Sequence, residues 1–165
     1  QLLRQAGVSS ALLNLGGNIQ TVGSRPDGDP WQIGVKDPST GQPMMVLSIR
    51  DQAVVTSGGY ERYFQQDGRT YWHIMDPATG RPAESGLRSV TIVGDDGLVC
   101  DGLSTALFVM GLDRGVQFWQ TWRDHDDVRF ECIFITDDGS VYLTPGLADA
   151  FTLADGQSRE VTVLS

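Results

Sequence analysis

The alternation of apolar and polar residues predicts that this chain folds mainly as short strands. Apolar runs recur along its length, and glycine pairs, Asp-Gly steps and proline-containing turns separate them. The runs expected as strands are SSALLNL, NIQTV, Trp31 to Lys36, Met44 to Ile49, Val54 to Thr56, Tyr60 to Gln65, TYWHI, Ser89 to Val93, FECIFIT, SVYLT and VTVL. Because the connections are short and rich in turn residues, neighbouring strands are expected to pair as an antiparallel meander.

Helical spacing of apolar residues begins at about Cys100, and a second helix is expected over Asp113 to Arg123. The residues that carry the first signal are Leu103, Leu107 and Met110. The opening segment QLLRQAG reads as the last turns of another helix with Gly7 as its C-cap, which favours the C-terminal part of a longer protein. The expected fold is α+β, a single domain over residues 1–165 in which a helix pair covers one face of an antiparallel sheet.

Composition and charge exclude several classes of function. The chain has 165 residues, a formal net charge of -9 and a pI near 4.4, so it lacks the clustered basic residues that bind a phosphate backbone, and no nucleic-acid partner is expected. No run of eighteen apolar residues occurs, so no membrane-spanning segment is expected either. Cys100 and Cys132 lack metal-ligand spacing and are expected to be small buried hydrophobes.

An aspartate and a hydroxyl residue are the first candidates for chemistry. Asp101 and Thr105 are four positions apart near the start of the expected helix, so both side chains project from one face. Carboxylate and hydroxyl oxygens suit Mg²⁺, which takes one or two protein oxygens and fills its other positions with water and substrate phosphate. In the structural alternative, Asp101 interacts with the helix dipole and Thr105 packs against the preceding turn. The spacing alone leaves both interpretations open.

The segment HIMDPATG, from His73 to Gly80, is the second candidate. Asp76 to Gly80 has the residues of a plain turn, with Asp accepting from the backbone, Pro fixing φ and Gly taking a positive φ. The turn does not require His73, which could accept a proton from a hydroxyl nucleophile at neutral pH or be structural. The glycine pairs of NLGG and TSGGY are likewise either simple bulges or places where backbone amides approach an anion.

Taken together, these segments resemble the ApbE family, the FAD:protein FMN transferases. The resemblance is carried by NLGGNIQTVG, PWQIGVKDP, VVTSGGYERYF, HIMDPATGRP, SVTIVG and CDGLSTALFVMG, in that order. It covers most of residues 1 to about 115 and is specific, because several independent segments agree. It implies an ApbE-like architecture related to the T-fold. The family's N-terminal half, which includes a Gly-Ala-rich segment with a lysine, has no counterpart in this sequence.

The resemblance implies transfer of FMN from FAD to a threonine or serine hydroxyl of a target protein, with Mg²⁺ bound and AMP released. Carried over by position, Asp101 and Thr105 would bind Mg²⁺ on the FAD pyrophosphate, and His73 would activate the hydroxyl nucleophile. The residues implied to contact FAD or shape its pocket are Asn14, Gly16, Gly17, Ser57, Gly58, Tyr60, Ile74, Met75 and Asp76.

Two alternatives to transfer stay open. One is FAD hydrolysis to FMN and AMP, in which water replaces the protein hydroxyl at the same Mg²⁺ site. The other is a flavin-binding or scaffold module without catalysis, which would be favoured if the natural protein had lost the family's N-terminal half; without that half, the chain would be catalytically incomplete. By resemblance, the acceptor protein carries a D-x-x-[ST]-G-[AS]-T motif. The enzyme is expected at the extracytoplasmic face of a bacterial membrane, lipid-anchored through an N-terminal segment that is not in this sequence.

Overall fold

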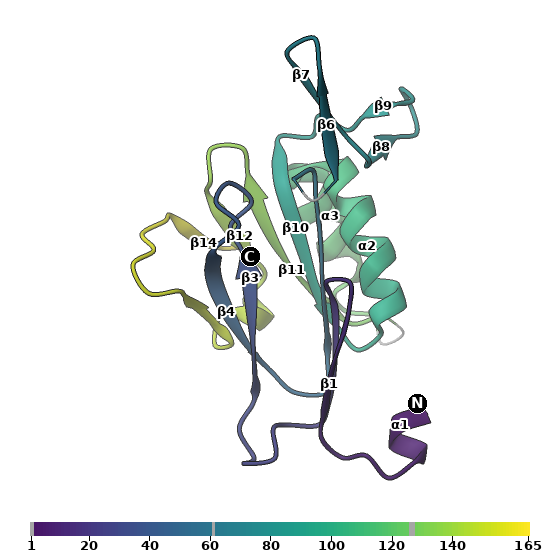
Figure 1. Cartoon of the computed structure of the whole chain (residues 1–165), viewed down its shortest axis with the longest axis vertical. Coiled ribbons are helices and arrows are strands. Elements are labelled where there is room, and N and C mark those ends of the chain that lie inside the picture. The colour runs from purple at the N-terminus through teal and green to yellow at the C-terminus, as the bar shows by residue number, and fades with distance from the viewer. Residues whose placement is uncertain (1, 61, 126–127) are drawn as a thin grey trace.

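In the computed structural model, three layers stack around one large sheet (Figure 1). Residues 2–60, 62–125 and 128–165 are described. A seven-stranded sheet lies between two helices on one face and a three-stranded sheet on the other. Alternate residues of its central strands face the two layers, so the sheet contributes to two hydrophobic cores. The expected α+β fold with a helix pair on one face is therefore confirmed, and the second covering layer is an addition to it.

The large sheet has the order β1-β2-β5-β10-β11-β12-β14. Its strands are β1 (Ala11–Leu15), β2 (Asn18–Val22), β5 (Ala53–Gly58), β10 (Leu87–Gly94), β11 (Phe130–Thr136), β12 (Val141–Leu143) and β14 (Val161–Val163). Neighbours pair antiparallel except β12 and β14, which are parallel, so the expectation of a purely antiparallel sheet was wrong at this edge. The reason is that the chain leaves the large sheet after β12 and crosses to the second sheet before it returns as β14.

The three-stranded sheet has the order β13-β4-β3 and covers the face opposite the helices. Its strands are β3 (Trp31–Lys36), β4 (Pro43–Ile49) and β13 (Phe151–Leu153). The hairpin of β3 and β4 matches the sequence prediction closely, because apolar and polar positions alternate clearly in β3. β13 was not expected, because its three residues are too few to show a period. Met44, Met45 and Leu47 of β4 are fully buried against the large sheet.

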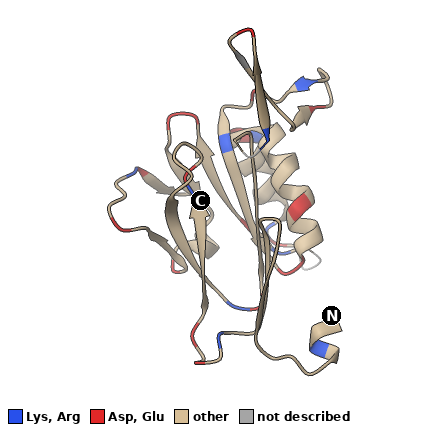
Figure 2. Cartoon of the chain, viewed as in Figure 1, with Lys and Arg blue, Asp and Glu red and all other residues tan. Residues whose placement is uncertain are grey.

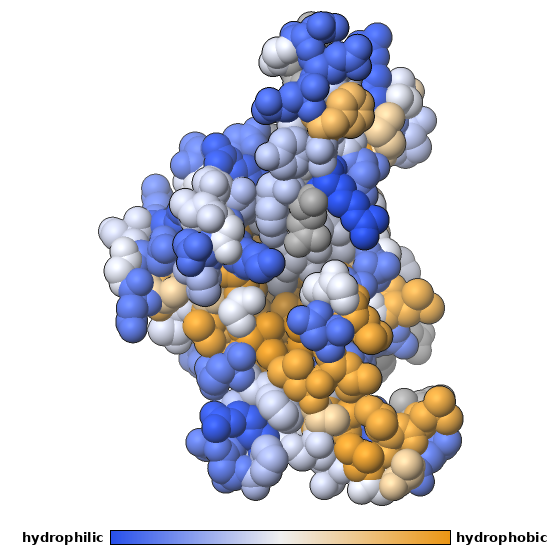
Figure 3. All heavy atoms as spheres, viewed as in Figure 1, coloured by the Kyte–Doolittle hydropathy of each residue, from blue (hydrophilic) through white to orange (hydrophobic). Residues whose placement is uncertain are grey.

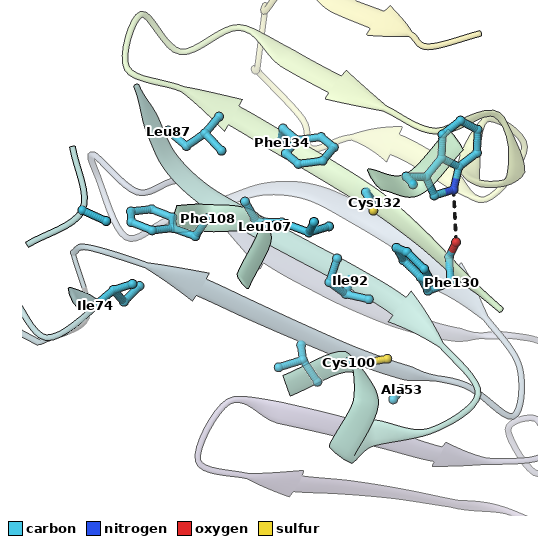
Figure 4. Close-up of a cluster of buried hydrophobic side chains, with 14 residues drawn as sticks. Ala53, Ile74, Leu87, Ile92, Cys100, Leu107, Phe108, Phe130, Cys132 and Phe134 are labelled. Atoms are coloured by element: carbon cyan, nitrogen blue, oxygen red, sulfur yellow. Dashed lines mark hydrogen bonds between the residues drawn. The ribbon is translucent and has the colours of Figure 1, made fainter. Parts of the chain in front are cut away.

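The two helices are α2 (Gly97–Met110) and α3 (Leu112–Trp122), and a short α1 (Leu2–Gln5) opens the chain. α2 begins earlier than the expected start near Cys100, because the Asp96 side chain caps it by accepting from Leu98 N at 2.8 Å and Val99 N at 3.2 Å. Figure 4 shows Leu107 and Phe108 inside the core cluster beneath α2.

Both cysteines are free and buried in this cluster, as expected. Burial, reinforced by the nearby Asp96 and Asp95 carboxylates, raises the pKa of the Cys100 thiol to about 12.

A hairpin stands out from the three layers at one end of the molecule (Figure 1). It consists of β6 (Tyr63–Gln66) and β7 (Arg69–Trp72), and the short pair β8 (Met75–Asp76) and β9 (Arg81–Pro82) follows it. The strand expected from Tyr60 starts at Tyr63 instead; Glu61, inside that expected run, lies outside the described residues. β6 pairs with β7 and not with β5, because β5 is held on both sides by β2 and β10.

Charged side chains lie mostly in loops and at strand ends, and Lys and Arg are scattered as single positions in the view of Figure 2. Within the described ranges, no helix is both long and apolar enough to cross a membrane.

One ion pair joins the β3–β4 turn to the segment before β14. Arg159 Nη2 donates to Asp37 Oδ2, and Asp37 Oδ1 accepts from Ser39 N at 2.7 Å. The Asp37 side chain is 2% exposed and the Arg159 side chain 22%. Burial alone would raise the pKa of Asp37, but the Ser39 N–H and the Arg159 guanidinium outweigh it, so the pKa of this carboxyl is lowered.

Replacing Asp37 by Asn should lower the free energy of unfolding by about 1.5–3 kcal/mol at neutral pH, because a charge-assisted bond to a largely buried partner is lost. The folded-state pKa of Asp37 lies below its unfolded value, so this stabilisation is present above about pH 4 and is lost as the pH falls through the folded pKa. Denaturant unfolding between pH 2 and 7 measures it. The exposed Asp155, changed to Asn, is the control; equal stability of the two variants at pH 7 would contradict the prediction.

Candidate functional site

The side chains of α2 that face β5 form the centre of the candidate site. Val55 and Ser57 of β5 face α2, whereas Val54 and Thr56 face the opposite layer. Ser57 Oγ lies 2.8 Å from Ser104 Oγ and 3.1 Å from Thr105 Oγ1. The alternation of β5 therefore brings a hydroxyl residue from a sequence-distant strand directly against the predicted metal-ligand helix.

Asp101 and Thr105 lie on one exposed face of α2, as their spacing predicts. Ser104 between them is buried, and its Oγ donates to Asp101 O at 3.0 Å. Because α2 begins at Gly97, Asp101 lies beyond the first helical turn. The interaction with the helix dipole offered as its structural alternative is therefore weaker than the sequence indicated.

Asn18 is a site residue that sequence reasoning missed. Its Nδ2 donates to Asp101 Oδ1 at 3.0 Å, which joins the β1–β2 hairpin to α2 across 83 positions of sequence. The turn before it places Asn18 at the start of β2, since Gly16 and Gly17 have φ of 68° and 104°. Asn14, predicted to shape the pocket, accepts from Gly17 N at 2.9 Å and so stabilises this turn. The sequence feature that could have identified Asn18 is an amide residue directly after a glycine pair.

His73 lies at the base of the projecting hairpin, between β7 and β8. Its side chain is exposed, its backbone N–H donates to Arg62 O at 3.2 Å, and its Nδ1 lies 3.3 Å from the same oxygen. The next residue, Ile74, is buried in the same core cluster as Phe108 of α2 (Figure 4). The packing of Ile74 therefore fixes the position of His73 relative to the helix.

Asp76 forms the turn that the sequence predicts. Its carboxylate accepts from Ala78 N at 2.9 Å and from Thr79 Oγ1 at 3.3 Å, and Gly80 N donates to Asp76 O at 2.8 Å. Gly80 has φ 66°, which suits its place in the turn. The Met75 side chain is 47% exposed. The segment thus presents backbone and Met75 outward and uses the Asp76 side chain internally.

Residues 57–60 connect the two parts of the site. Ser57 contacts α2, and a Cβ at Gly59 would lie 3.0 Å from the ring of Trp72, the residue before His73. Gly58 is packed between the Tyr60 ring and Arg88 O, where a Cβ would approach to 2.4 Å and 2.9 Å respectively. The double glycine therefore allows β5 to end close against Tyr60 and the hairpin base. No hydrogen bond among the described residues joins His73 directly to Asp101 or Thr105.

Two hollows flank this connecting segment. One of about 460 Å³ is lined by Gly59, Tyr60, Trp72, Phe108 and neighbouring residues, and one of about 340 Å³ is lined in part by Asn14, Gly17 and Tyr60. Tyr60 lies at both. In the described part of the chain, neither hollow includes Asp101, Thr105 or His73. The candidate metal position is therefore assigned from the side chains of Asp101 and Thr105 and their hydrogen bonds, and not from either hollow.

Apolar surface borders the Asp101 and Asn18 pair. Leu98, 82% exposed, lies one helical turn before Asp101, and Leu15, 70% exposed, is the register partner of Asn18. Figure 3 shows apolar surface gathered over the β1 region and α1. Neighbouring apolar side chains reduce the number of waters that compete for the polar atoms.

The oxygen ligands that the site offers suit Mg²⁺ better than a metal ion that requires three or more protein ligands. Where the structure describes the chain, no group of three or more His, Cys, Asp and Glu side chains could hold a metal ion. Mg²⁺ needs only one or two protein oxygens beside water and phosphate. Asp101 and Thr105 supply a carboxylate and a hydroxyl on one exposed helix face, and Asp101 Oδ1 is already oriented by Asn18. These residues fit the ion that the sequence implies.

Comparison with known proteins agrees with these segments. Residues 1–130 match the sequence profile of the ApbE family. A FAD:protein FMN transferase from Klebsiella pneumoniae (strain 342) is 40% identical in an alignment that covers 86% of this chain and 42% of that protein. A FAD:protein FMN transferase from Treponema pallidum (strain Nichols) is 38% identical in an alignment that covers 95% of this chain and 45% of that protein.

The likeness extends to solved structures. The ApbE protein from Thermotoga maritima superposes with a TM-score of 0.73 at 35% identity, covering 86% of this chain and 44% of that one. Flavin transferase ApbE from Vibrio cholerae gives 0.72 at 32% identity, covering 90% and 47%. The architecture is thus shared, and the chain spans less than half the length of each of these proteins.

Replacing Gly58 by Ala should lower the free energy of unfolding by about 1–3 kcal/mol, because the new Cβ would overlap the Tyr60 ring and Arg88 O. Gly34→Ala in β3 is the matched control, since a Cβ there meets no heavy atom within 4 Å. Urea unfolding followed by tryptophan fluorescence measures both. If Gly58→Ala is as stable as Gly34→Ala, the described packing of residues 58–60 is wrong.

Proposed function

Because the chain belongs to the ApbE family, we propose that it forms the metal-binding side of a Mg²⁺-dependent FAD:protein FMN transferase. The observation that supports this most directly is the pair of oxygen ligands on α2, Asp101 and Thr105. The pair is held by Asn18 and Ser57 and is connected through residues 57–60 to the base of the hairpin that carries His73. Phosphoryl transfer to a hydroxyl uses a metal that neutralises charge and a residue that accepts the hydroxyl proton, and α2 and the hairpin base offer one candidate for each.

The proposed reaction displaces AMP at phosphorus. The hydroxyl oxygen of a threonine or serine in the acceptor protein attacks the phosphorus on the FMN side of the FAD pyrophosphate. The bond from that phosphorus to the bridging oxygen breaks, and AMP leaves with this oxygen. A bound Mg²⁺ would neutralise negative charge on the pyrophosphate, which is the main electrostatic obstacle to attack. Asp101 and Thr105 would hold it there.

His73 would receive the proton of the attacking hydroxyl. A carbonyl oxygen only accepts, so the contact of Nδ1 with Arg62 O places the proton on Nδ1 and leaves the lone pair on Nε2. The ring is exposed, so a substrate hydroxyl can reach it. In this arrangement Nε2 is the general base, and the hairpin backbone holds the tautomer that the role needs.

The other residues predicted to contact FAD or to shape its pocket differ in the contacts that their side chains make in the structure. Ile74 is buried and Asp76 is used within its turn, so these two would contact FAD mainly through backbone atoms. Asn14, Gly16 and Gly17 would set the shape of the β1–β2 turn beside Asp101. Tyr60, which lines the hollow beside Gly59, and Met75, whose side chain is exposed, would meet FAD through their side chains.

The family resemblance alone supports two further parts of the proposal. The acceptor protein would carry a D-x-x-[ST]-G-[AS]-T motif. The reaction would take place at the extracytoplasmic face of a bacterial membrane. Detection of the protein only in the cytoplasmic fraction of its native cells would contradict this location.

Mixing the chain with FAD, Mg²⁺ and a peptide bearing the acceptor motif should give a fluorescent FMN–peptide adduct and an equal amount of AMP. His73→Ala should reduce the rate about 10²–10⁴-fold, because general base catalysis is lost. The chain has only one other histidine, so His125→Ala is the matched control and should leave the rate unchanged.

Mass spectrometry of the peptide and chromatography of AMP measure this outcome. AMP released without adduct would instead show FAD hydrolysis. Neither product, with FAD bound, would indicate a binding module or a catalytically incomplete chain, and the same assay on a full-length protein would separate these two. Equal rates for the two histidine variants would reject His73 as the base.

Removal of the metal should weaken FAD binding sharply. In a net acidic chain, two pyrophosphate charges would approach the Asp101 carboxylate without compensation. Quenching of FAD fluorescence on titration with protein, with Mg²⁺ and with EDTA, measures the affinity. Asp101→Asn should bind FAD with the same weak affinity in both conditions, and unchanged affinity of the parent chain in EDTA would remove the metal from the proposal.

A further inference from the structure

Three hydroxyl groups and one carbonyl form a continuous chain of hydrogen bonds between α2 and β5. Ser104 Oγ lies 3.0 Å from Asp101 O, Ser57 Oγ lies 2.8 Å from Ser104 Oγ, and Thr105 Oγ1 lies 3.1 Å from Ser57 Oγ. Ser104 is fully buried and Ser57 is partly exposed, whereas Thr105 is exposed. The chain therefore runs from the interior to the position of the candidate metal ligand.

The direction of this chain is fixed at its buried end. A carbonyl oxygen can only accept, so the single hydroxyl proton of Ser104 is donated to Asp101 O. Ser104 Oγ must then accept from Ser57, whose proton is used in that bond. Ser57 Oγ in turn has only lone pairs to offer to Thr105. The Thr105 hydroxyl is thus the donor in its contact with Ser57.

This direction decides what Thr105 can do. With its proton aimed at Ser57, the lone pairs of Thr105 Oγ1 lie away from β5, on the exposed side of α2 that also carries Asp101. A hydroxyl that binds a cation must present lone pairs to it and direct its proton elsewhere. A proton pointing outward would instead repel a cation.

We propose that Ser57 is a positioning residue that sets Thr105 as a cation-facing acceptor through the directed chain Thr105–Ser57–Ser104–Asp101. Ser57 was expected to shape or line the FAD pocket, and this proposal gives its hydroxyl, which is bonded within the protein, a specific role there. The identity of the ion as Mg²⁺ rests on the proposed function, whereas the direction of the hydrogen bonds does not.

Mn²⁺ alone, without FAD, is the probe, because it shares the oxygen preference of Mg²⁺ and the free ion is counted by electron paramagnetic resonance. Ser57→Ala should weaken Mn²⁺ affinity about tenfold or more, as loss of an outer-shell hydrogen bond does. Ser57→Thr retains the hydroxyl and should restore the affinity. The control is Thr91→Val, which removes a buried hydroxyl bonded to Thr56 on the opposite face of the sheet and should leave Mn²⁺ affinity unchanged.

A double-mutant cycle separates action through Thr105 from any other effect. Thr105→Val removes the hydroxyl ligand, and in that background Ser57→Ala should weaken Mn²⁺ binding no further. An equal loss in both backgrounds overturns the proposal. So does unchanged affinity in Ser57→Ala, or a loss in Ser57→Thr as large as in Ser57→Ala.

Circular dichroism and thermal unfolding confirm that each variant is folded before binding is measured. No Mn²⁺ binding by the parent chain overturns both this proposal and the metal role in FMN transfer. Binding by the parent with no effect of Ser57→Ala overturns this proposal alone. The adduct assay tests transfer independently.

Discussion

The packing of α2 on β5 and β10 is the contact on which the rest of the site depends. Leu107 and Phe108 are buried against the sheet, and this places the opposite side of the helix, with Asp101 and Thr105, at the surface. The same packing brings Ser104 and Thr105 against Ser57. A helix with the same residues but without this docking would still present Asp101 and Thr105 on one face, yet nothing would orient the threonine hydroxyl.

The register of β5 determines which of its residues meet the helix. Ser57 pairs with Val90 and Thr56 with Thr91, so hydroxyl groups project from both faces of the sheet. A slip of one residue would turn Ser57 to the three-stranded sheet and Thr56 to α2. The apolar core on each face opposes such a slip, because Val54 and Val55 would also exchange layers. Core packing thereby specifies the chemistry of the site as well as its stability.

Local features of the sequence predicted much of the fold. The alternation in Trp31–Lys36 and the apolar run Phe130–Thr136 gave strands with the observed limits. The start of α2 was placed too late, because its N-terminus depends on the Asp96 cap and not on apolar spacing. β13 and the parallel pairing of β14 could not be predicted, because both depend on where a distant strand has an open edge.

In the candidate site, too, local features were predictable and contacts between distant residues were not. The spacing of Asp101 and Thr105 is a helix property and was predictable, as was the Asp76 turn. The contacts of Asn18 with Asp101 and of Ser57 with Ser104 join residues 83 and 47 positions apart, so no local pattern contains them. The most direct test of the account is an anomalous difference map from crystals of the chain grown with FAD and Mn²⁺. The account predicts a peak bound by Asp101 and Thr105 oxygens beside the FAD pyrophosphate. An ordered pyrophosphate with its metal at any other residues would contradict it.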